Sequence, residues 1–137
     1  MSSLLGISEA ASIGWHAMIL LADAGDELRS TAEIAEILQV SGAHLSKVLQ
    51  RLTRAGLVEA VRGPRGGFRL GKSAKEITIL EIFEVIEGPI QERQCLLRKP
   101  VCNGKCCIIG GLLRQIDELK ENLGTLTLEE ATEKSLH

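Results

Sequence analysis

Residues 61–70, VRGPRGGFRL, decide the fold of this chain. Branched and aromatic side chains on both sides of the glycines favour two short β-strands, at 57–61 and 68–70. The glycines permit the backbone angles that a tight tip needs. We therefore predict a β-hairpin with a narrow cationic loop. Its basic side chains are Arg62, Arg65 and Arg69.

Two helices joined by a tight turn are predicted just before this hairpin. Ser30 and Glu33 have the spacing of a capping box, which indicates a helix over 31–38. Ser41 supplies the cap of a further helix that ends near Gly56. The apolar inner face of this second helix consists of Leu45, Val48, Leu49 and Leu52.

The outer face of the second helix has the composition of a DNA-reading surface. Residues near the start of such a helix reach base edges in the major groove, and its basic residues reach phosphates. An ordinary solvated amphipathic helix is the alternative, and this segment alone does not decide between them. The hairpin favours DNA, because a cationic loop can enter a minor groove or clamp phosphates. The outward residues are Ala43, His44, Ser46, Lys47, Gln50, Arg51 and Arg54.

The glycine-rich loop could instead cradle a nucleotide phosphate. Phosphate loops lead from a strand into the N-terminus of a helix. The loop at 62–67 leads from one predicted strand into another. Nucleotide binding is therefore disfavoured.

Charge is segregated along the chain, although the net charge is only −2. From Lys47 to Lys75 there are eight basic residues and one acidic residue, Glu59, a local charge of +7. The rest, with eight basic and 17 acidic residues, carries −9. A basic segment in an acidic chain is typical of a focused DNA-contact surface.

Four more helices complete the predicted order. Ser8 caps a first helix that runs to about residue 24, and Thr78 caps another that Gly88 closes. Leucine and isoleucine at helical spacing continue from residue 108 or 112 to 123, and Thr127 with Glu130 opens a last short helix. The expected buried face of the first helix consists of Ile13, Ala17, Leu20 and Ala24.

Composition excludes several classes of protein. The 137 residues, 45% hydrophobic and 25% charged, suit one compact unit. Aromatic residues are only 2%, too few for the stacking platforms of single-strand binders. The three histidines lie in no catalytic constellation, so we expect no enzyme. Acidic residues interrupt the N-terminal apolar run without a preceding basic segment, so we expect neither a leader nor a membrane span and place the protein in the cytoplasm.

Four cysteines, Cys95, Cys102, Cys106 and Cys107, are packed into thirteen residues. In a reducing cytoplasm such a group indicates metal ligands or reactive thiols. Structural zinc is disfavoured, because adjacent cysteines rarely bind one metal and the spacing lacks two close pairs. A thiol switch near the basic residues of this stretch stays open. A small iron-sulfur electron carrier would not explain the helix pair or the +7 segment.

The chain resembles the IscR/NsrR-type winged-helix transcriptional regulators from residue 7 to about 130. The segments that carry the resemblance are EIA at 33–35, LSKVL at 45–49, RAGLV at 54–58, VRGPRGGFRL at 61–70, and ITIL at 77–80 through EGP at 87–89. The resemblance implies a mostly α fold with a small β-hairpin wing, a winged helix-turn-helix. It implies a DNA-binding domain at 1–90, a cysteine-rich sensor loop at 91–107, and a dimerisation helix and tail at 108–137. The implied assembly is a homodimer on a near-palindromic duplex operator.

The resemblance also implies an iron-sulfur cluster, usually 2Fe-2S, held by three cysteines. Soft thiolates suit such clusters, and Cys95, Cys102 and Cys107 are the expected ligands. The gap between the first two is one residue longer than the commonest IscR-like spacing, and Gly110 stands where a ligand histidine would fall. His16 of the partner subunit is the leading fourth ligand. The other candidates are Cys106, Ser12 and Glu9.

These observations predict a homodimeric transcriptional regulator that senses redox, iron-sulfur status or nitric oxide. A cluster-free thiol switch and a partner-controlled repressor of the same fold are the alternatives. The predicted DNA contacts are Ser30, Ala43, His44, Ser46, Lys47, Gln50, Arg51, Arg62, Arg65 and Arg69.

Overall fold

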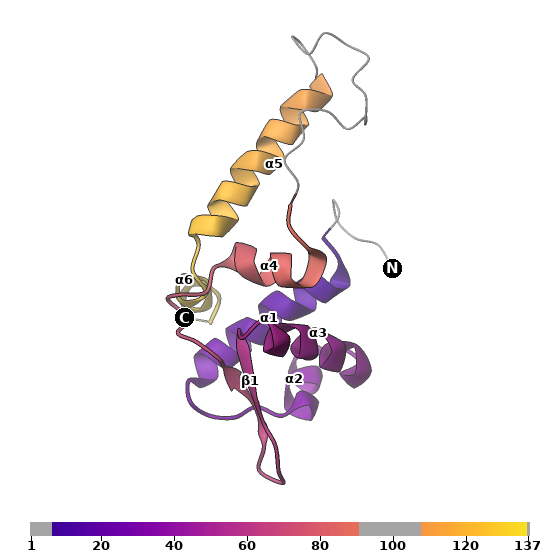
Figure 1. Ribbon diagram of the computed structural model, residues 1–137, viewed down its shortest axis with the longest axis vertical. Helices are drawn as coiled ribbons and strands as arrows, with labels where there is room; N and C mark the ends of the chain where they lie inside the picture. The colour runs from indigo at the N-terminus through magenta and orange to yellow at the C-terminus, as the bar shows by residue number, and fades with distance from the viewer. Residues whose placement is uncertain (1–6, 91–107, 137) are drawn as a thin grey trace.

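The computed structural model describes residues 7–90 and 108–136, and in the second range it describes side chains from residue 111. Within these residues it is mostly helical with one two-stranded hairpin, as predicted (Figure 1). The elements are α1 Glu9–Ala24, α2 Thr31–Leu38, α3 Gly42–Arg54, β1 Val58–Val61, β2 Gly67–Leu70, α4 Ile79–Glu87, α5 Ile108–Thr125 and α6 Leu128–Leu136.

Hydroxyl caps start the helices where the sequence predicted them. The side chains of Ser8, Ser30, Ser41 and Thr78 each accept a hydrogen bond from the backbone amide three residues later, at 3.0 to 3.1 Å. Such caps satisfy amides that have no partner inside the helix. The predicted capping box of α2 is one-sided, because the Glu33 carboxylate lies 3.7 Å from Arg29. The box at Thr127 and Glu130 is reciprocal.

Helix α1 lies at the centre of the core and contacts α2, α3, α4, α6 and β2. Its buried face differs from the expected one. Ile13 and Ala17 are buried as predicted, but Leu20 and Ala24 are only half-buried. Met18 and Leu21 are fully buried instead. A helix covered from several sides buries more than one stripe, so a single three-and-four pattern misplaces its face.

The predicted inner face of α3 is confirmed, since Leu45, Val48, Leu49 and Leu52 are all buried. The hairpin is antiparallel, with Val58 opposite Leu70 and Val61 opposite Gly67. Strand β1 begins one residue later than predicted, because the Leu57 amide donates to the Leu52 carbonyl and extends the turn after α3. We call β1, β2 and the turn at 62–66 the wing.

Helix α5 rises away from the body, and α6 returns to pack on α1 (Figure 1). Two backbone hydrogen bonds fasten their junction to the start of α4, from the Ile79 amide to the Leu126 carbonyl at 3.0 Å and from the Leu128 amide to the Ile77 carbonyl at 2.8 Å. Leu128 is fully buried, so α6 contributes to the core. The expected division of the chain at residue 108, between a sensor loop and a dimerisation helix, stays a prediction. Among the described residues, no helix has the length and apolarity needed to cross a bilayer.

Candidate nucleic-acid interface

The wing and the α2–α3 pair lie at the same end of the molecule, opposite the end toward which α5 rises (Figure 1). Along α3, Ala43, Lys47 and Gln50 are exposed, and His44 and Ser46 are half-buried. The buried leucine face of α3 turns these side chains away from the core. The structure therefore brings the predicted contacts of the helix and of the wing to one side of the core.

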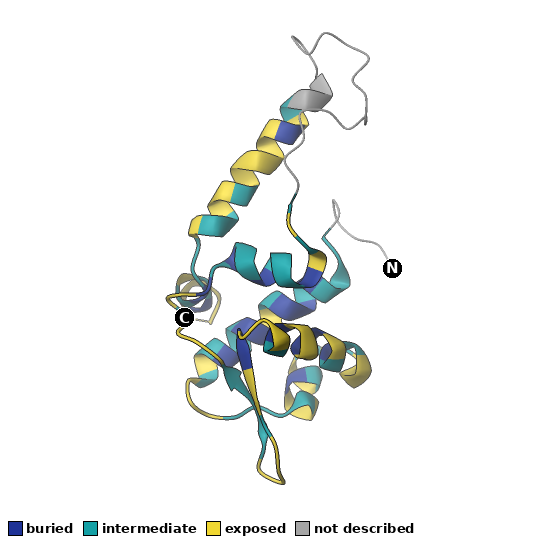
Figure 2. Cartoon of the chain, viewed as in Figure 1, coloured by how far each residue is buried: buried dark blue, intermediate teal, exposed yellow. Residues whose placement is uncertain are grey.

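Close backbone packing shapes the tip of the wing. The Gly66 amide donates to the Gly63 carbonyl at 2.9 Å. A Cβ at Gly66 would lie 2.1 Å from the Val61 carbonyl oxygen, so a larger residue cannot occupy this turn without moving backbone. Arg62 and Arg65 are exposed on the tip, as Figure 2 shows for the turn as a whole. Their guanidinium groups form no ion pair with the residues that the structure describes.

Arg29 joins the start of α2 to the wing, a placement that the sequence did not predict. Its amide donates to the Phe68 carbonyl at 3.0 Å, and the Phe68 amide donates to the Arg29 carbonyl at 2.8 Å. A Cβ at Gly67 would lie 2.7 Å from this same carbonyl oxygen. The contact joins residues 39 positions apart through backbone atoms alone. No local motif signals such a bridge, although a basic residue directly before the Ser30 cap is compatible with phosphate contact.

Arg69 differs from the other wing arginines, because Glu59 neutralises it across the hairpin. Arg69 Nε donates to Glu59 Oε2 at 2.7 Å. That hydrogen bond, and then the positive charge of the guanidinium, lowers the pKa of Glu59. The same hydrogen bond, and then the negative charge of the Glu59 carboxylate, raises the pKa of Arg69. Arg62 and Arg65 therefore carry the uncompensated charge of the wing, while Arg69 contributes less to any long-range attraction of phosphate.

Three other predicted contacts have partners inside the protein. Ser30 Oγ accepts the Glu33 amide, so its hydroxyl can still donate. The His44 ring lies 3.5 Å from the carboxylate of Glu9, at the start of α1. The guanidinium of Arg51 donates to the carbonyl oxygen of Ile86 at 2.8 Å.

The predicted metal ligands are only partly within the described residues. Cys95, Cys102 and Cys107, and also Cys106, lie outside them. His16 is exposed on α1, and its Nδ1 donates to the Ser12 carbonyl at 2.7 Å. Metal-binding histidines commonly donate one ring nitrogen to a carbonyl in this way, which leaves Nε2 for the metal. Residues 7–90 and 108–136 contain no group of three histidine, cysteine, aspartate or glutamate side chains that could hold a metal by itself.

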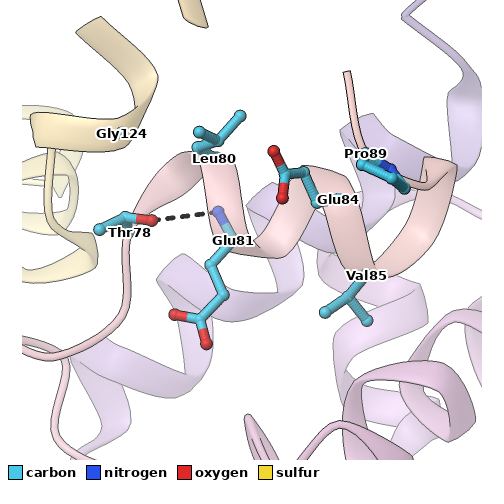
Figure 3. A pocket seen from close by; sticks show the side chains of 7 residues that line it. All are labelled: Thr78, Leu80, Glu81, Glu84, Val85, Pro89 and Gly124. Carbon is cyan, nitrogen blue, oxygen red and sulfur yellow. Dashed lines mark hydrogen bonds between the residues drawn. The ribbon is translucent and has the colours of Figure 1, made fainter. Parts of the chain in front are cut away.

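A hollow of about 430 Å³ lies where α5 leaves α4 (Figure 3). Leu80 and Val85 supply its apolar part, and Glu81 and Glu84 supply carboxylates. Above it, α5 exposes residues along most of its length (Figure 2). The large apolar side chains exposed there are Leu112 at 54%, Ile116 at 44% and Leu119 at 48%.

Comparison with known proteins gives consistent relatives. The sequence pattern of the Rrf2 family, described as an iron-dependent transcriptional regulator, matches residues 7–134. The HTH-type transcriptional regulator IscR of Photorhabdus laumondii is 34% identical over 100 residues, which make up 72% of this chain and 61% of that protein. The chain thus spans about three fifths of the length of this relative.

Solved structures share the fold over nearly the whole chain. CymR, the global cysteine regulator of B. subtilis, matches with a TM-score of 0.81 and 30% identity, over 98% of this chain and 99% of that one. The oxidized form of Staphylococcus aureus CymR matches with a TM-score of 0.75 and 29% identity, over 93% and 95%. These relatives are regulators, which agrees with the expectation that the chain is not an enzyme. The chain belongs to the Rrf2 family of transcriptional regulators.

Proposed function

We propose that this chain acts as a homodimeric regulator that binds duplex DNA through α3 and the wing. The observation that carries the proposal is the placement of Lys47, Arg62 and Arg65 together with the outer face of α3 at one end of the molecule. These cations are exposed and form no ion pair with described residues, in a chain whose remainder is acidic. Such a surface attracts phosphate, and Glu59, the one acidic residue between Lys47 and Lys75, is paired with Arg69.

In this proposal the helix and the wing have different tasks. Ala43, His44, Ser46 and Gln50 lie along the first three turns of α3, the part of a recognition helix that reaches base edges. The wing tip is narrow, because its glycines bring backbone within contact distance, and it carries arginines suited to phosphates or a minor groove. Base reading by α3 then sets sequence preference, and wing contacts supply affinity that depends on salt.

The exposed face of α5 supports a dimer. Leu112, Ile116 and Leu119 recur at helical spacing, and a helix that is apolar on a solvent-exposed face normally packs on a partner. The apolar part of the hollow at Leu80 and Val85 lies at the base of the same helix. A second copy that covers α5 would place two recognition helices on one duplex, and a near-palindromic operator matches that symmetry.

The sensor that we propose is an iron-sulfur cluster held by Cys95, Cys102 and Cys107 with His16 of the partner subunit. The donor set fits, because three thiolates and an imidazole are ligands that such clusters accept. The Nδ1 bond of His16 to a carbonyl leaves Nε2 in the tautomer that ligates. Bound there, a cluster would supply a redox-sensitive link between subunits. Cys106, Ser12 and Glu9 remain the other candidate ligands, although Glu9 already faces His44.

A cluster-free thiol switch is the second candidate for the sensor. The similarity to CymR, which is named for cysteine regulation and has an oxidized form, favours it. In this version a cysteine thiolate of the same stretch is oxidised reversibly, and no metal is needed. DNA binding by α3 and the wing is the same in both versions, and we expect either to work in the cytoplasm.

Duplex binding is tested first. A duplex selected from a random pool is titrated with protein between 50 and 200 mM salt. We expect log Kd to vary steeply with log salt, with a slope of roughly 0.9 per phosphate neutralised. Arg65→Met should lower that slope by about one such unit while the protein stays folded. Salt-insensitive binding, or failure to enrich any duplex, would reject the proposal.

The sensor is tested by analysis of protein purified without oxygen. Iron and sulfide near two atoms each per chain, with a brown chromophore, support a 2Fe-2S cluster. Cys95→Ser, Cys102→Ser and Cys107→Ser should each lose it, and Cys106→Ser should keep it. Metal-free protein whose DNA binding responds to peroxide or diamide, and is restored by thiol, identifies the thiol switch instead. His16→Ala with unchanged iron content and spectrum would remove His16 from the ligand set.

A further inference from the structure

Arg51 is exposed, but its guanidinium connects two helices. Arg51 belongs to the last turn of α3, and the sequence predicted a DNA contact for it. Its Nη1 donates to the Ile86 carbonyl at 2.8 Å, across 35 positions of sequence. Ile86 is the penultimate residue of α4, so this carbonyl is one of those that a helix end leaves without an internal partner. A guanidinium there satisfies the carbonyl and complements the negative end of the helix dipole.

The side chain of Ile86 fixes the same helix end from the other side. It is 5% exposed and sits in a notch between α1 and α3. A Cβ at Gly14 would lie 2.1 Å from Ile86 Cδ1 and 3.6 Å from Val48 Cγ1. Ser8, the cap of α1, donates a hydrogen bond to the Glu87 carboxylate. The end of α4 is thus joined to α3 by Arg51 and to α1 by packing and by Ser8.

The start of α4 is also joined to the rest of the molecule. Trp15 on α1 donates from Nε1 to the Ile79 carbonyl at 2.9 Å, and its ring stacks on Phe83 with centroids 5.7 Å apart. The Ile79 amide bonds to the Leu126 carbonyl, at the junction of α5 and α6. Helix α4 therefore connects the base of α5 with the recognition helix, as its position between them in Figure 1 illustrates.

We propose that Arg51 is a positioning residue, whose bond to the Ile86 carbonyl sets the placement of α3 on α4 and thereby the DNA affinity of the surface. The inference rests on the proposed function, because it takes α3 as the DNA-reading helix. It assigns Arg51 a role other than neutralising phosphate. A change at either end of α4 then reaches α3 through this bond and through the packing of Ile86.

The test compares Arg51→Met with Arg62→Met. Both changes remove one guanidinium and keep an unbranched stem, but Arg62 lies on the wing tip without an ion pair among described residues. Each variant is titrated onto the selected duplex at several salt concentrations, at a temperature where circular dichroism shows it fully folded. Amide hydrogen exchange is measured on the free proteins, with the Gly88 amide, which donates to the Glu84 carbonyl in the last turn of α4, as the reporter.

We expect Arg51→Met to weaken binding roughly 2- to 30-fold, the range for residues that couple elements, with the salt slope of the wild type. Gly88 and the last turn of α3 should exchange faster in this variant. Arg62→Met should lower the slope by about 0.9 and leave exchange unchanged. A slope that falls equally in both variants with unchanged exchange identifies Arg51 as a phosphate contact and overturns the proposal. Wild-type affinity in Arg51→Met also overturns the proposal, even if the variant is less stable than the wild type.

Arg51→Lys covers the case in which the methionine variant does not fold. Lysine keeps the charge but carries one compact ammonium in place of the planar guanidinium and ends about one bond shorter. A phosphate contact predicts near-wild-type affinity for this variant, whereas a positioning role predicts weaker binding and faster Gly88 exchange. If the wild-type protein binds no duplex, the proposed function fails, and the exchange measurement on free protein still decides whether Arg51 holds α3 to α4.

Discussion

At the scale of single residues, the wing shows that a basic side chain is not automatically a phosphate contact. Arg69 is an arginine of the wing like Arg62 and Arg65, but it lies in β2, where Glu59 opposes it directly in the hairpin register. The sequence places an acid at 59 and a base at 69, yet only the register reveals that they pair. Opposite charges paired across strands stabilise a hairpin modestly. The pairing also leaves the charge of Arg69 compensated, so that it attracts phosphate less strongly.

The pairing predicts how Glu59 titrates. Because the hydrogen bond and charge of Arg69 lower the pKa of Glu59 below its ordinary value of 4.5, the pair stabilises the fold above pH 4.5. That contribution disappears as the pH falls through the lowered pKa. Arg69→Met should raise the pKa of Glu59 back toward 4.5, as measured by NMR titration of its carboxyl carbon.

The same variant has a functional readout. Since Arg69 is already compensated, Arg69→Met should reduce the salt slope of DNA binding by less than Arg62→Met does. An equal reduction in the two variants would show that Arg69 leaves Glu59 when DNA binds. An unchanged carboxyl titration would show that the ion pair does not form in solution.

At the scale of elements, local signals predicted where helices begin and end. The caps at Ser8, Ser30, Ser41 and Thr78 act on amides three residues away, so the sequence contains both partners of each bond. The buried face of α1 was less predictable, because five elements pack around that helix and burial at Met18 and Leu21 depends on all of them. The backbone bridge of Arg29 to the wing was not predicted either, because its partner Phe68 is distant in sequence and only the tertiary fold brings the two together.

The cap of α3, the proposed recognition helix, leads to a prediction at this scale. Ser41 Oγ accepts the His44 amide at 3.0 Å, and His44 is a proposed base contact. Ser41→Ala should lower the free energy of unfolding by about 1 kcal/mol, the usual contribution of a hydroxyl cap. Urea denaturation followed by circular dichroism measures this loss, and Ser41→Asp, which restores an acceptor, should recover most of it.

DNA affinity separates the effect of the Ser41 cap on overall stability from its effect on the first turn of α3. The first turn of α3 should fray in Ser41→Ala, so binding weakens even where the domain is folded. Ser135→Ala serves as the control, because Ser135 is exposed near the end of α6, far in sequence from α3. Equal stability of Ser41→Ala and the wild type would show that solvent replaces the cap without cost.

At the scale of the whole molecule, the fold was predictable because the wing motif and the helix pair are contiguous in sequence. The candidate site was predictable only in part. Which residues face outward on α3 follows from the position of its leucines, but Arg51 faces outward by periodicity and still bonds to α4. A long side chain can return to the protein surface, and helical spacing carries no information about that. The four cysteines proposed for the sensor lie outside the described residues, so their role as ligands stays a prediction.

The last prediction concerns the proposed dimer, on which the proposed operator binding depends. Ile116 lies in the middle of the exposed apolar stripe of α5, 44% exposed, between Leu112 and Leu119. A lysine there would place a charge in the buried seam of the proposed dimer, where an unpaired charge is strongly unfavourable. Ile116→Lys should therefore sediment as a monomer at concentrations where the wild type is a dimer. Its affinity for a two-half-site duplex should fall by roughly 100-fold or more, because the second half-site contact is no longer intramolecular.

Glu121→Gln is the matched control for this change. It alters the net charge by the same amount, but residue 121 lies on the opposite side of α5 from the stripe and is exposed. Sedimentation velocity of both variants, with and without duplex, separates loss of the seam from a general effect of charge. A single half-site duplex should bind Ile116→Lys and the wild-type protein about equally, since each contact surface remains complete on one subunit. A dimeric Ile116→Lys that binds the full operator normally would place the dimer interface elsewhere than on α5.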